Sequence, residues 1–146
     1  RICRKNPDGT SNLLLQGVSR IRVLEILRED PYRVVKVEPL TTIVDDSQPV
    51  PRSSLSTLLE ENNRLGGDAT EDILEFLGPI ENDEAYVDLV SFVLCRETLR
   101  KQRLLETLDL TERASFLTAH LKEENERLRL LKEALGDFPE DEVDSN

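Results

Sequence analysis

The residues that could carry out catalysis are few in this chain and stand in unsuitable surroundings. There is one histidine, His120, which lies within a helical pattern between Leu117 and Leu121. Nucleophilic catalysis needs a serine, cysteine or threonine next to a base that activates it. A histidine inside a regular helix does not by itself provide that pair. We therefore interpret His120 as a packing or surface residue.

The sequence also lacks the patterns of phosphate and metal chemistry. Nucleotide hydrolysis needs a loop of the form G-x-x-x-x-G-K-[ST], and the glycine pair Gly66-Gly67 is followed by Asp68 instead. The pair Asp45-Asp46 is too sparse for a calcium loop, and Cys3 and Cys95 are too far apart for a zinc or redox motif. We predict no catalytic residue, no cofactor and no metal, and hence a chain that is not an enzyme.

The charge balance restricts the partners. Thirty acidic against nineteen basic residues give a net charge of −11, which repels phosphate backbones and anionic lipid. We therefore expect neither nucleic acid nor a membrane as partner. The sequence contains no apolar run long enough to cross a bilayer, and the two distant cysteines suit a reducing compartment, so we expect a cytoplasmic location.

The first part of the chain has the pattern of short antiparallel strands. Pro7-Asp8-Gly9 is typical of a tight turn, and Glu29-Asp30-Pro31 of a second one. Partial alternation of β-branched and charged residues in 20–25 and in 32–38 indicates strands on either side of that second turn. We predict part of a β domain over residues 1–44 and a linker, rich in Asp, Ser and Pro, over residues 45–54.

From residue 55 onward the apolar residues recur with the period of helices. The pattern predicts helices over Leu55–Leu65, around Ile73–Leu77, from Glu81 to Leu94, from Glu97 to Leu105, and from the capping pair Asp109 and Glu112 to Gly136. Residues 55–136 are thus predicted to be a helical subdomain. The acidic residues 137–146 have little apolar content and are predicted to be a disordered tail.

The leucine stripe of the last helix has one interruption. Glu124 stands where an apolar residue is expected, between Leu121 and Leu128. Either one turn of the helix is partly exposed, or the distal part leaves the bundle and presents its leucines elsewhere. A free leucine stripe can also form a coiled-coil seam with a second copy. Oligomerisation through this carboxy-terminal helix is therefore an alternative function for the chain.

Two blocks of sequence resemble the amino-terminal domain of Lon-type ATP-dependent proteases. The first, in residues 12–25 and 31–38, has an apolar strand, Gln-Gly, an Arg-x-Arg strand, Pro-Tyr and x-Val-Glu. The second, in residues 101–109 followed by Arg113, has Gln-x-Leu-Leu-Glu before an Asp-x-x-x-Arg helix start. The blocks occur in the same order as in the family. The resemblance covers roughly residues 1–40 and 85–135.

This resemblance implies an α+β fold, with a partial antiparallel β meander of a PUA-like domain followed by a helical bundle that ends in one long helix. It also implies a non-catalytic module of protein quality control that recognises unfolded or degron-bearing polypeptides. In a full-length Lon-type protease, separate modules supply the ATPase and the serine peptidase. Because further strands precede the position of Arg1 in that family, we expect the chain to begin inside the β domain. The acidic tail stands where a protease would continue into its ATPase, so we expect either a stand-alone Lon-domain protein or a fragment.

The resemblance also places the polypeptide-binding residues in the first block. The candidates share positions on the expected exposed loops and strand face of the β part, and they are Gln16, Gly17, Arg20, Arg22, Pro31 and Tyr32. An alternative interpretation is that Gln16-Gly17 and Pro31-Tyr32 only shape turns.

Overall fold

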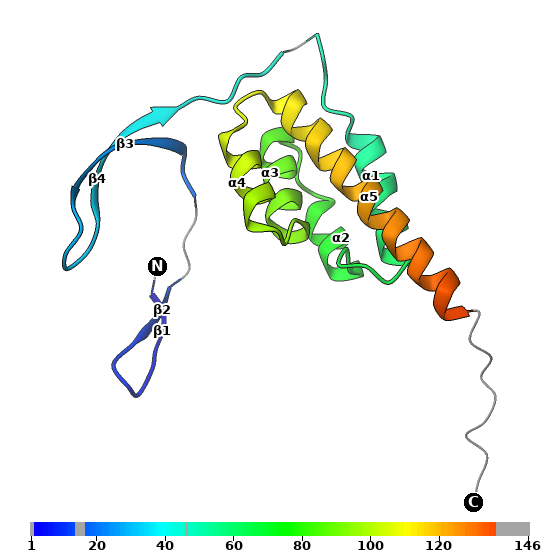
Figure 1. Ribbon diagram of the computed structural model, residues 1–146, viewed down its shortest axis with the longest axis horizontal. Coiled ribbons are helices and arrows are strands. Elements are labelled where there is room, and N and C mark those ends of the chain that lie inside the picture. Colours follow the sequence, from blue (N-terminus) through cyan, green and yellow to red (C-terminus); the bar gives the residue numbers. More distant parts are fainter. Residues whose placement is uncertain (1, 14–16, 46, 137–146) are drawn as a thin grey trace, which may run out of the picture. The chain divides into compact units, whose positions relative to one another are not determined.

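The chain has an α+β fold, as the sequence predicted. A computed structural model describes residues 2–13, 17–45 and 47–136, and these contain four strands and five helices (Figure 1). The chain divides into two units, Arg1–Thr41 and Thr42–Asn146, which are described separately below. The first unit holds the strands and the second holds the helices.

The first unit begins with a short hairpin. Strand β1 (Ile2–Lys5) pairs antiparallel with β2 (Ser11–Leu13). At the turn, Gly9 has φ +84°, which glycine adopts without the steric cost that other residues meet. The Oδ1 atom of Asp8 accepts hydrogen bonds from the backbone N–H and the hydroxyl of Thr10, and these bonds lower the pKa of Asp8. The Pro-Asp-Gly sequence therefore forms the turn for which its residue types are suited.

A second hairpin, the β3–β4 ribbon, consists of β3 (Arg20–Arg28) and β4 (Val34–Leu40). The strands pair antiparallel, with Arg22 opposite Glu38 and Val23 opposite Val37. The register shifts between Val23 and Glu25 and again between Ile26 and Arg28. Such irregularities leave an extra residue on one strand and increase the local twist.

The second unit is a bundle of helices joined by short connections. Its helices are α1 (Arg52–Arg64), α2 (Glu71–Leu77), α3 (Asp83–Leu94), α4 (Thr98–Glu106) and α5 (Leu110–Gly136). Side chains cap two of them: Asn82 accepts from the backbone N–H of Ala85 at 2.8 Å, and Asp109 accepts from that of Glu112 at 2.8 Å. Because capping satisfies N–H groups that have no partner inside the helix, these residues fix where α3 and α5 begin.

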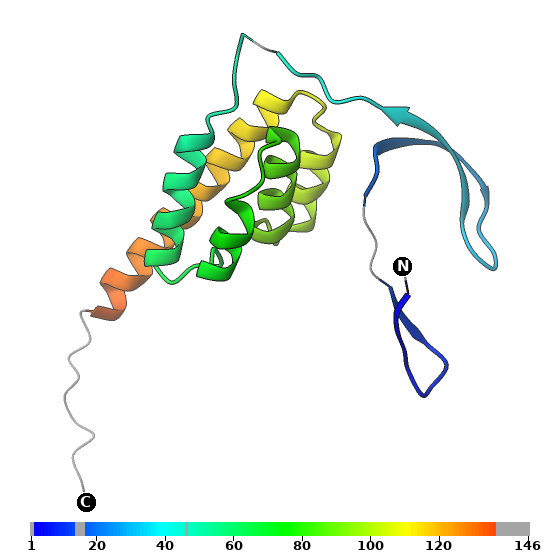
Figure 2. The ribbon, with the colours of Figure 1, turned by 180° about the vertical axis from the view of Figure 1, so that it is seen from behind.

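The hydrophobic core lies within the helical unit. Helices α1 and α5 run side by side in both views of Figures 1 and 2, and α3 packs against α5. Most of its fully or almost fully buried apolar residues come from these three helices, and they are Leu55, Leu59, Val87, Val90, Ala114, Leu117 and Leu121. Strands β3 and β4 contribute no residue to this core. In the part of the chain that the structure describes, no helix has both the length and the apolar character for crossing a membrane.

Helix α5 does not leave the bundle at Glu124, because the next residue replaces the missing apolar contact with a polar one. Asn125 is 1 % exposed, and its Oδ1 atom accepts a hydrogen bond of 2.9 Å from Nδ2 of Asn62 in α1. The Nδ2 atom of Asn125 donates to the carbonyl oxygen of Leu58 at 2.9 Å. The Oδ1 atom of Asn62 accepts from the backbone N–H of Ala69. This network holds α1 and α5 together for one more turn.

Candidate functional site

Strand β3 exposes an unusual amount of apolar surface. Its five aliphatic residues are each between 49 % and 59 % exposed, and they are Ile21, Val23, Leu24, Ile26 and Leu27. Leu24 and Leu27 stand at the two shifts of the β3–β4 register. Contiguous apolar surface that is rimmed by polar residues is characteristic of a binding surface, since it costs free energy to keep it in water.

The hydrogen-bonding edges of the same ribbon are also unpaired. In the described residues β3 pairs with β4 alone, so each strand has an outer edge that meets no other strand. An open edge presents backbone N–H and C=O groups that can accept a further strand. Apolar side chains and an open edge together suit an extended polypeptide, which adds as a strand and places alternate side chains against the apolar ones.

Two of the residues predicted to bind polypeptide lie on this strand. Arg20 and Arg22 are two positions apart on β3, so their side chains lie on the same face. Arg22 is exposed and forms an ion pair of 3.1 Å with Glu38 of β4. Arg20 is partly buried at the start of the strand and takes part in interactions. Charged groups thus lie at the end of β3 that is far from the β3–β4 turn.

The other predicted residues lie in the loops. Pro31 and Tyr32 belong to the turn between β3 and β4; the Asp30–Pro31 peptide bond is cis, and Tyr32 is 64 % exposed with the guanidinium of Arg28 4.5 Å from its ring centroid. Gly17 is exposed before β3, and a Cβ atom added there would meet open space. Gln16 lies outside the described residues. Tyr32 and Arg22 therefore lie along one ribbon, and binding by any of the six stays a prediction.

A buried arginine organises the start of the helical unit. Arg113 of α5 is 0 % exposed, and its NH1 atom donates to Asp88 of α3 at 2.7 Å. Its Nε atom donates to the carbonyl oxygen of Thr107 at 3.1 Å, and its NH2 atom donates to the hydroxyl of Thr42 at 3.4 Å. The hydroxyl of Thr42 in turn donates to Glu84 of α3. A single guanidinium therefore holds the chain at residue 42 against α3 and α5.

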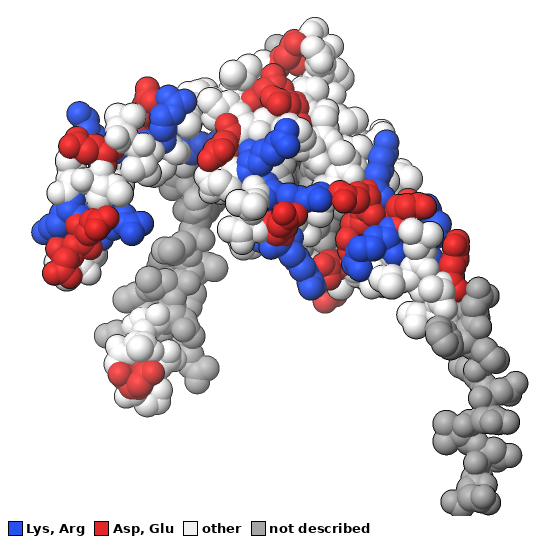
Figure 3. Space-filling model, viewed as in Figure 1, with Lys and Arg blue, Asp and Glu red and all other residues white. Residues whose placement is uncertain are grey.

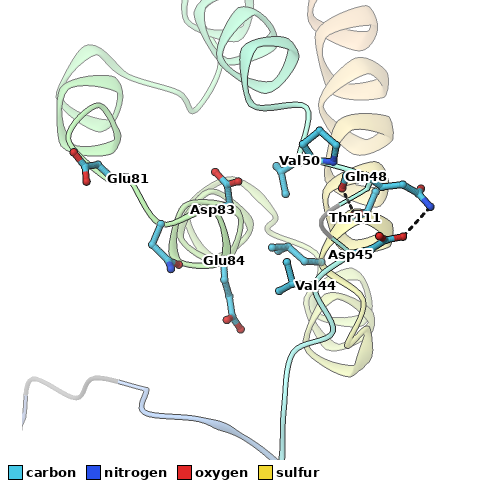
Figure 4. A pocket seen from close by; sticks show the side chains of 11 residues that line it. Val44, Asp45, Gln48, Val50, Glu81, Asp83, Glu84 and Thr111 are labelled. Atoms are coloured by element: carbon cyan, nitrogen blue, oxygen red, sulfur yellow. Dashed lines mark hydrogen bonds between the residues drawn. The ribbon is translucent and has the colours of Figure 1, made fainter.

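The chain that follows Thr42 forms one wall of a pocket of about 430 Å³ (Figure 4). Asp83 and Glu84 come from the start of α3 and Glu81 from the turn before it. Asp45 comes from the segment before α1, where its carboxylate accepts a hydrogen bond of 3.2 Å from the side-chain amide of Gln48. Asp83 is paired with Arg52 at 3.1 Å, and the hydroxyl of Thr111 holds the segment by donating to the carbonyl of residue 48 at 2.9 Å. In the described part of the chain no group of His, Cys, Asp or Glu is arranged to hold a metal ion.

Sequence reasoning assigned no role to Arg113, although the residue was part of the motif that carries the resemblance. Its partners Asp88 and Thr42 are far from it in the sequence, so no local pattern indicates that its charge is buried. The one signal was its type and position, because an arginine on the core side of a helix needs carboxylate and carbonyl partners. That signal could have identified the buried charge but not its partners.

A known protein family matches most of the chain. Residues 1–123 match the family described as the ATP-dependent protease La (LON) substrate-binding domain. The chain belongs to this family. The match covers most of the chain, from its first residue to the middle of α5.

Three curated relatives of this LON substrate-binding domain are Lon proteases that are much longer than the chain. The chain is 30 % identical over 128 residues to a Lon protease of Citrifermentans bemidjiense, which is 86 % of the chain and 16 % of that protease. It is 31 % identical over 126 residues to a Lon protease of Dictyoglomus thermophilum, 85 % of the chain and 16 % of the protease. A Lon protease of Syntrophus aciditrophicus is 28 % identical over 140 residues, 94 % of the chain and 18 % of the protease. The chain thus spans less than a fifth of each relative.

Proposed function

We propose that this LON substrate-binding domain recognises unfolded or degron-bearing polypeptides by adding them as a strand to the β3–β4 ribbon. The observation that carries the proposal is the combination, on one ribbon, of exposed aliphatic side chains with edges that pair with no other described strand. Membership of a substrate-binding family supports it. The role does not require a catalytic group, which suits a chain matched to that domain alone.

Strand addition suits clients of varied sequence. Most of its affinity comes from backbone hydrogen bonds, which every extended polypeptide can form. The bulged Leu24 and Leu27 would contact apolar client residues, and such residues are exposed in unfolded proteins and buried in folded ones. Selection of unfolded over folded clients follows from these two properties.

The test is a titration of the chain into a fluorescently labelled, reduced and carboxymethylated protein that cannot fold. We expect saturable binding, weakened about tenfold or more by the pair Leu24→Lys and Leu27→Lys, which adds charge to the ribbon. The matched control is the pair Phe76→Lys and Leu99→Lys on the helical unit, because these residues are 63 % and 77 % exposed. A parent chain without saturable binding, or a ribbon variant that binds as the parent does, contradicts the proposal.

A second experiment, with a client peptide, tests whether the client binds as a strand. A client peptide methylated on alternate backbone nitrogens keeps its side chains but cannot donate to one edge of a strand. We expect the methylated peptide to bind at least about tenfold more weakly than its parent, because strand addition depends on those donors. Equal affinities would show that the ribbon binds through side chains alone.

Self-association is a second candidate, favoured by the distal part of α5. There Leu128, Leu131 and Leu135, with Leu65 at the end of α1, line an apolar hollow of about 500 Å³. The spacing of the α5 leucines matches a coiled-coil seam, so a second copy of the helix could fill the hollow. We expect Leu131→Glu to lower the mass measured by light scattering at high concentration. Leu130→Glu is the control, since Leu130 is 58 % exposed and outside the hollow. A monomeric parent chain at high concentration excludes this candidate.

The proposal excludes nucleic acid and membranes as partners. It places the chain in the cytoplasm. The net charge of −11 opposes binding to polyanions. In Figure 3, basic and acidic side chains alternate over the face of the helical unit that the view shows, and no wide basic area appears there. Cys95 is a buried free thiol, which suits a reducing compartment.

A further inference from the structure

A third pocket, between α4 and α5, differs from the ribbon in its chemistry. It has a volume of about 300 Å³, and Cys95 and Leu104 lie in its wall together with Phe116. Cys95 is 0 % and Leu104 is 6 % exposed. Burial raises the pKa of the Cys95 thiol, so this group stays protonated and neutral at neutral pH. The inner wall is therefore apolar, and the pocket is large enough for a single side chain.

Arg103 provides a positively charged rim to this pocket. Its guanidinium lies over the ring of Phe116, with 3.9 Å between Cζ and the ring centroid. Among the described residues the side chain has no hydrogen-bond or ion-pair partner. Stacking leaves the N–H groups at the edge of the guanidinium available and restricts its plane. A guanidinium held in this way is prepared to bind a carboxylate through two parallel hydrogen bonds.

The remaining charges of the pocket are already balanced. Arg100 donates a hydrogen bond of 2.8 Å to Glu123. This bond raises the pKa of Arg100 and lowers the pKa of Glu123. Arg100 also lies 3.1 Å from the Nδ1 atom of His120. Because an arginine can only donate, Nδ1 is the acceptor, and the proton of a neutral His120 is on Nε2. Within the described residues that N–H has no partner. The pocket thus offers donors and one uncompensated positive charge.

We propose that this pocket binds the carboxy-terminal residue of a client polypeptide, with the terminal carboxylate on Arg103 and an apolar side chain against Cys95, Leu104 and Phe116. The terminal residue of a chain is the one place where a carboxylate and an apolar side chain share a single carbon atom. An aspartate or glutamate side chain brings the charge without the apolar group. The inference rests on the proposed function, since it names a feature by which clients are selected.

The experiment compares two short Gly/Ser-rich peptides that both end in leucine, one with a free carboxylate and one with a carboxamide. Binding of the labelled peptides to the whole 146-residue chain is followed by fluorescence anisotropy. We expect the free acid to bind about tenfold or more tightly than the amide. Replacing the terminal leucine by glycine should weaken the free acid by a similar factor, because the apolar wall is then left empty.

Variants of the chain assign the effect to the pocket. Arg103→Gln should bind the acid and the amide equally, and Arg103→Lys should fall between this variant and the parent because it keeps the charge but not the paired donors. The control is Lys101→Gln on the same helix, whose ammonium lies 4.9 Å from the ring centroid of Phe92 and not in the pocket. It should behave as the parent chain does.

Three results would overturn the inference. Acid and amide peptides that bind equally to the parent chain would show that the carboxylate is not recognised. An Arg103→Gln variant that still prefers the acid would place recognition elsewhere. Acetyl-leucine that competes as strongly as the peptide would assign the pocket to small carboxylic acids. In each case continued binding of the unfolded protein, and its loss in the Leu24→Lys and Leu27→Lys variant, would leave the proposed function intact.

Discussion

Arg113 is a fully buried charge whose partners come from α3, from the loop before α5 and from the chain at Thr42. A buried guanidinium is costly unless its donors are satisfied, and removing one member of such a group leaves the other groups without partners. Among the described side chains, no buried polar atom lacks a hydrogen-bond partner. Arg113 therefore connects three segments of chain through a network in which every buried polar atom is satisfied.

Replacing this arginine should destabilise the helical unit. We expect Arg113→Met to lower the free energy of unfolding by about 3 kcal/mol, because Asp88 and the carbonyl oxygens lose their partner. Urea denaturation followed by far-UV circular dichroism measures the change. The control is Arg96→Met, whose side chain is 79 % exposed in an ion pair with Asp68 and should change stability by less than about 1 kcal/mol. A change below that limit for Arg113→Met would show that the arginine does not hold these segments.

Gly67 is constrained by a side chain rather than by its backbone angles. A Cβ atom added there would lie 2.3 Å from the Oδ1 atom of Asn62, too close for any real contact. Asn62 cannot move without losing its hydrogen bonds to Asn125 and to the N–H of Ala69. The close contact at Gly67 thus depends on the polar network between α1 and α5.

Gly67→Ala should therefore destabilise the fold by about 2 kcal/mol, as expected when buried polar groups lose their partners. Gly78→Ala is the matched control, because an added Cβ there would meet its nearest atom at an ordinary 3.5 Å. Thermal unfolding of both variants gives the comparison. If the Gly67 variant is as stable as the parent, Asn62 must have an alternative position that keeps its bonds.

At the scale of elements, local patterns determined the helices well and their tertiary roles poorly. The capping residue Asp109 and the period of leucines predicted α5 close to its observed bounds, and Pro7-Asp8-Gly9 predicted the turn of the first hairpin. They did not predict that Asn125 would take the place of an apolar residue facing α1. The identity of that neighbour depends on Asn62, which is distant in the sequence. Whether the six residues predicted to bind polypeptide do so stays a prediction.

At the scale of the whole molecule, the two units differ in how far their apolar residues are buried. The apolar core consists of residues from the second unit, between Leu55 and Leu121. Strand β3 of the β3–β4 ribbon instead exposes its aliphatic residues, which the proposed client strand would cover. The buried apolar core and the exposed aliphatic residues of β3 thus lie in different units of the chain. The predicted boundaries at residues 44 and 54 stay predictions, and the tail at 137–146 lies outside the described residues.

This separation predicts that residues 42–146 fold without the strands. We expect that fragment to show one cooperative thermal transition by calorimetry, with a midpoint within about 5 °C of the helical transition of the whole chain, since about 1 kcal/mol corresponds to such a shift. The fragment should not bind the unfolded protein through a ribbon that it lacks. A fragment without a cooperative transition would show that the strands contribute to the stability of the helical unit.

The sequence by itself determined the α+β class, the order of strands and helices, the capping of the last helix and the resemblance to the LON substrate-binding family. These properties depend on residues near one another along the chain, or on motifs that are read in order. Only the tertiary structure decided that Arg113 and Asn125 are buried, that Gly67 faces Asn62, and that Arg103 lies over Phe116 at the rim of an apolar pocket. The physical reason is that the burial and pairing of a polar group depend on which distant segment packs against it, and local periodicity carries no information about that partner.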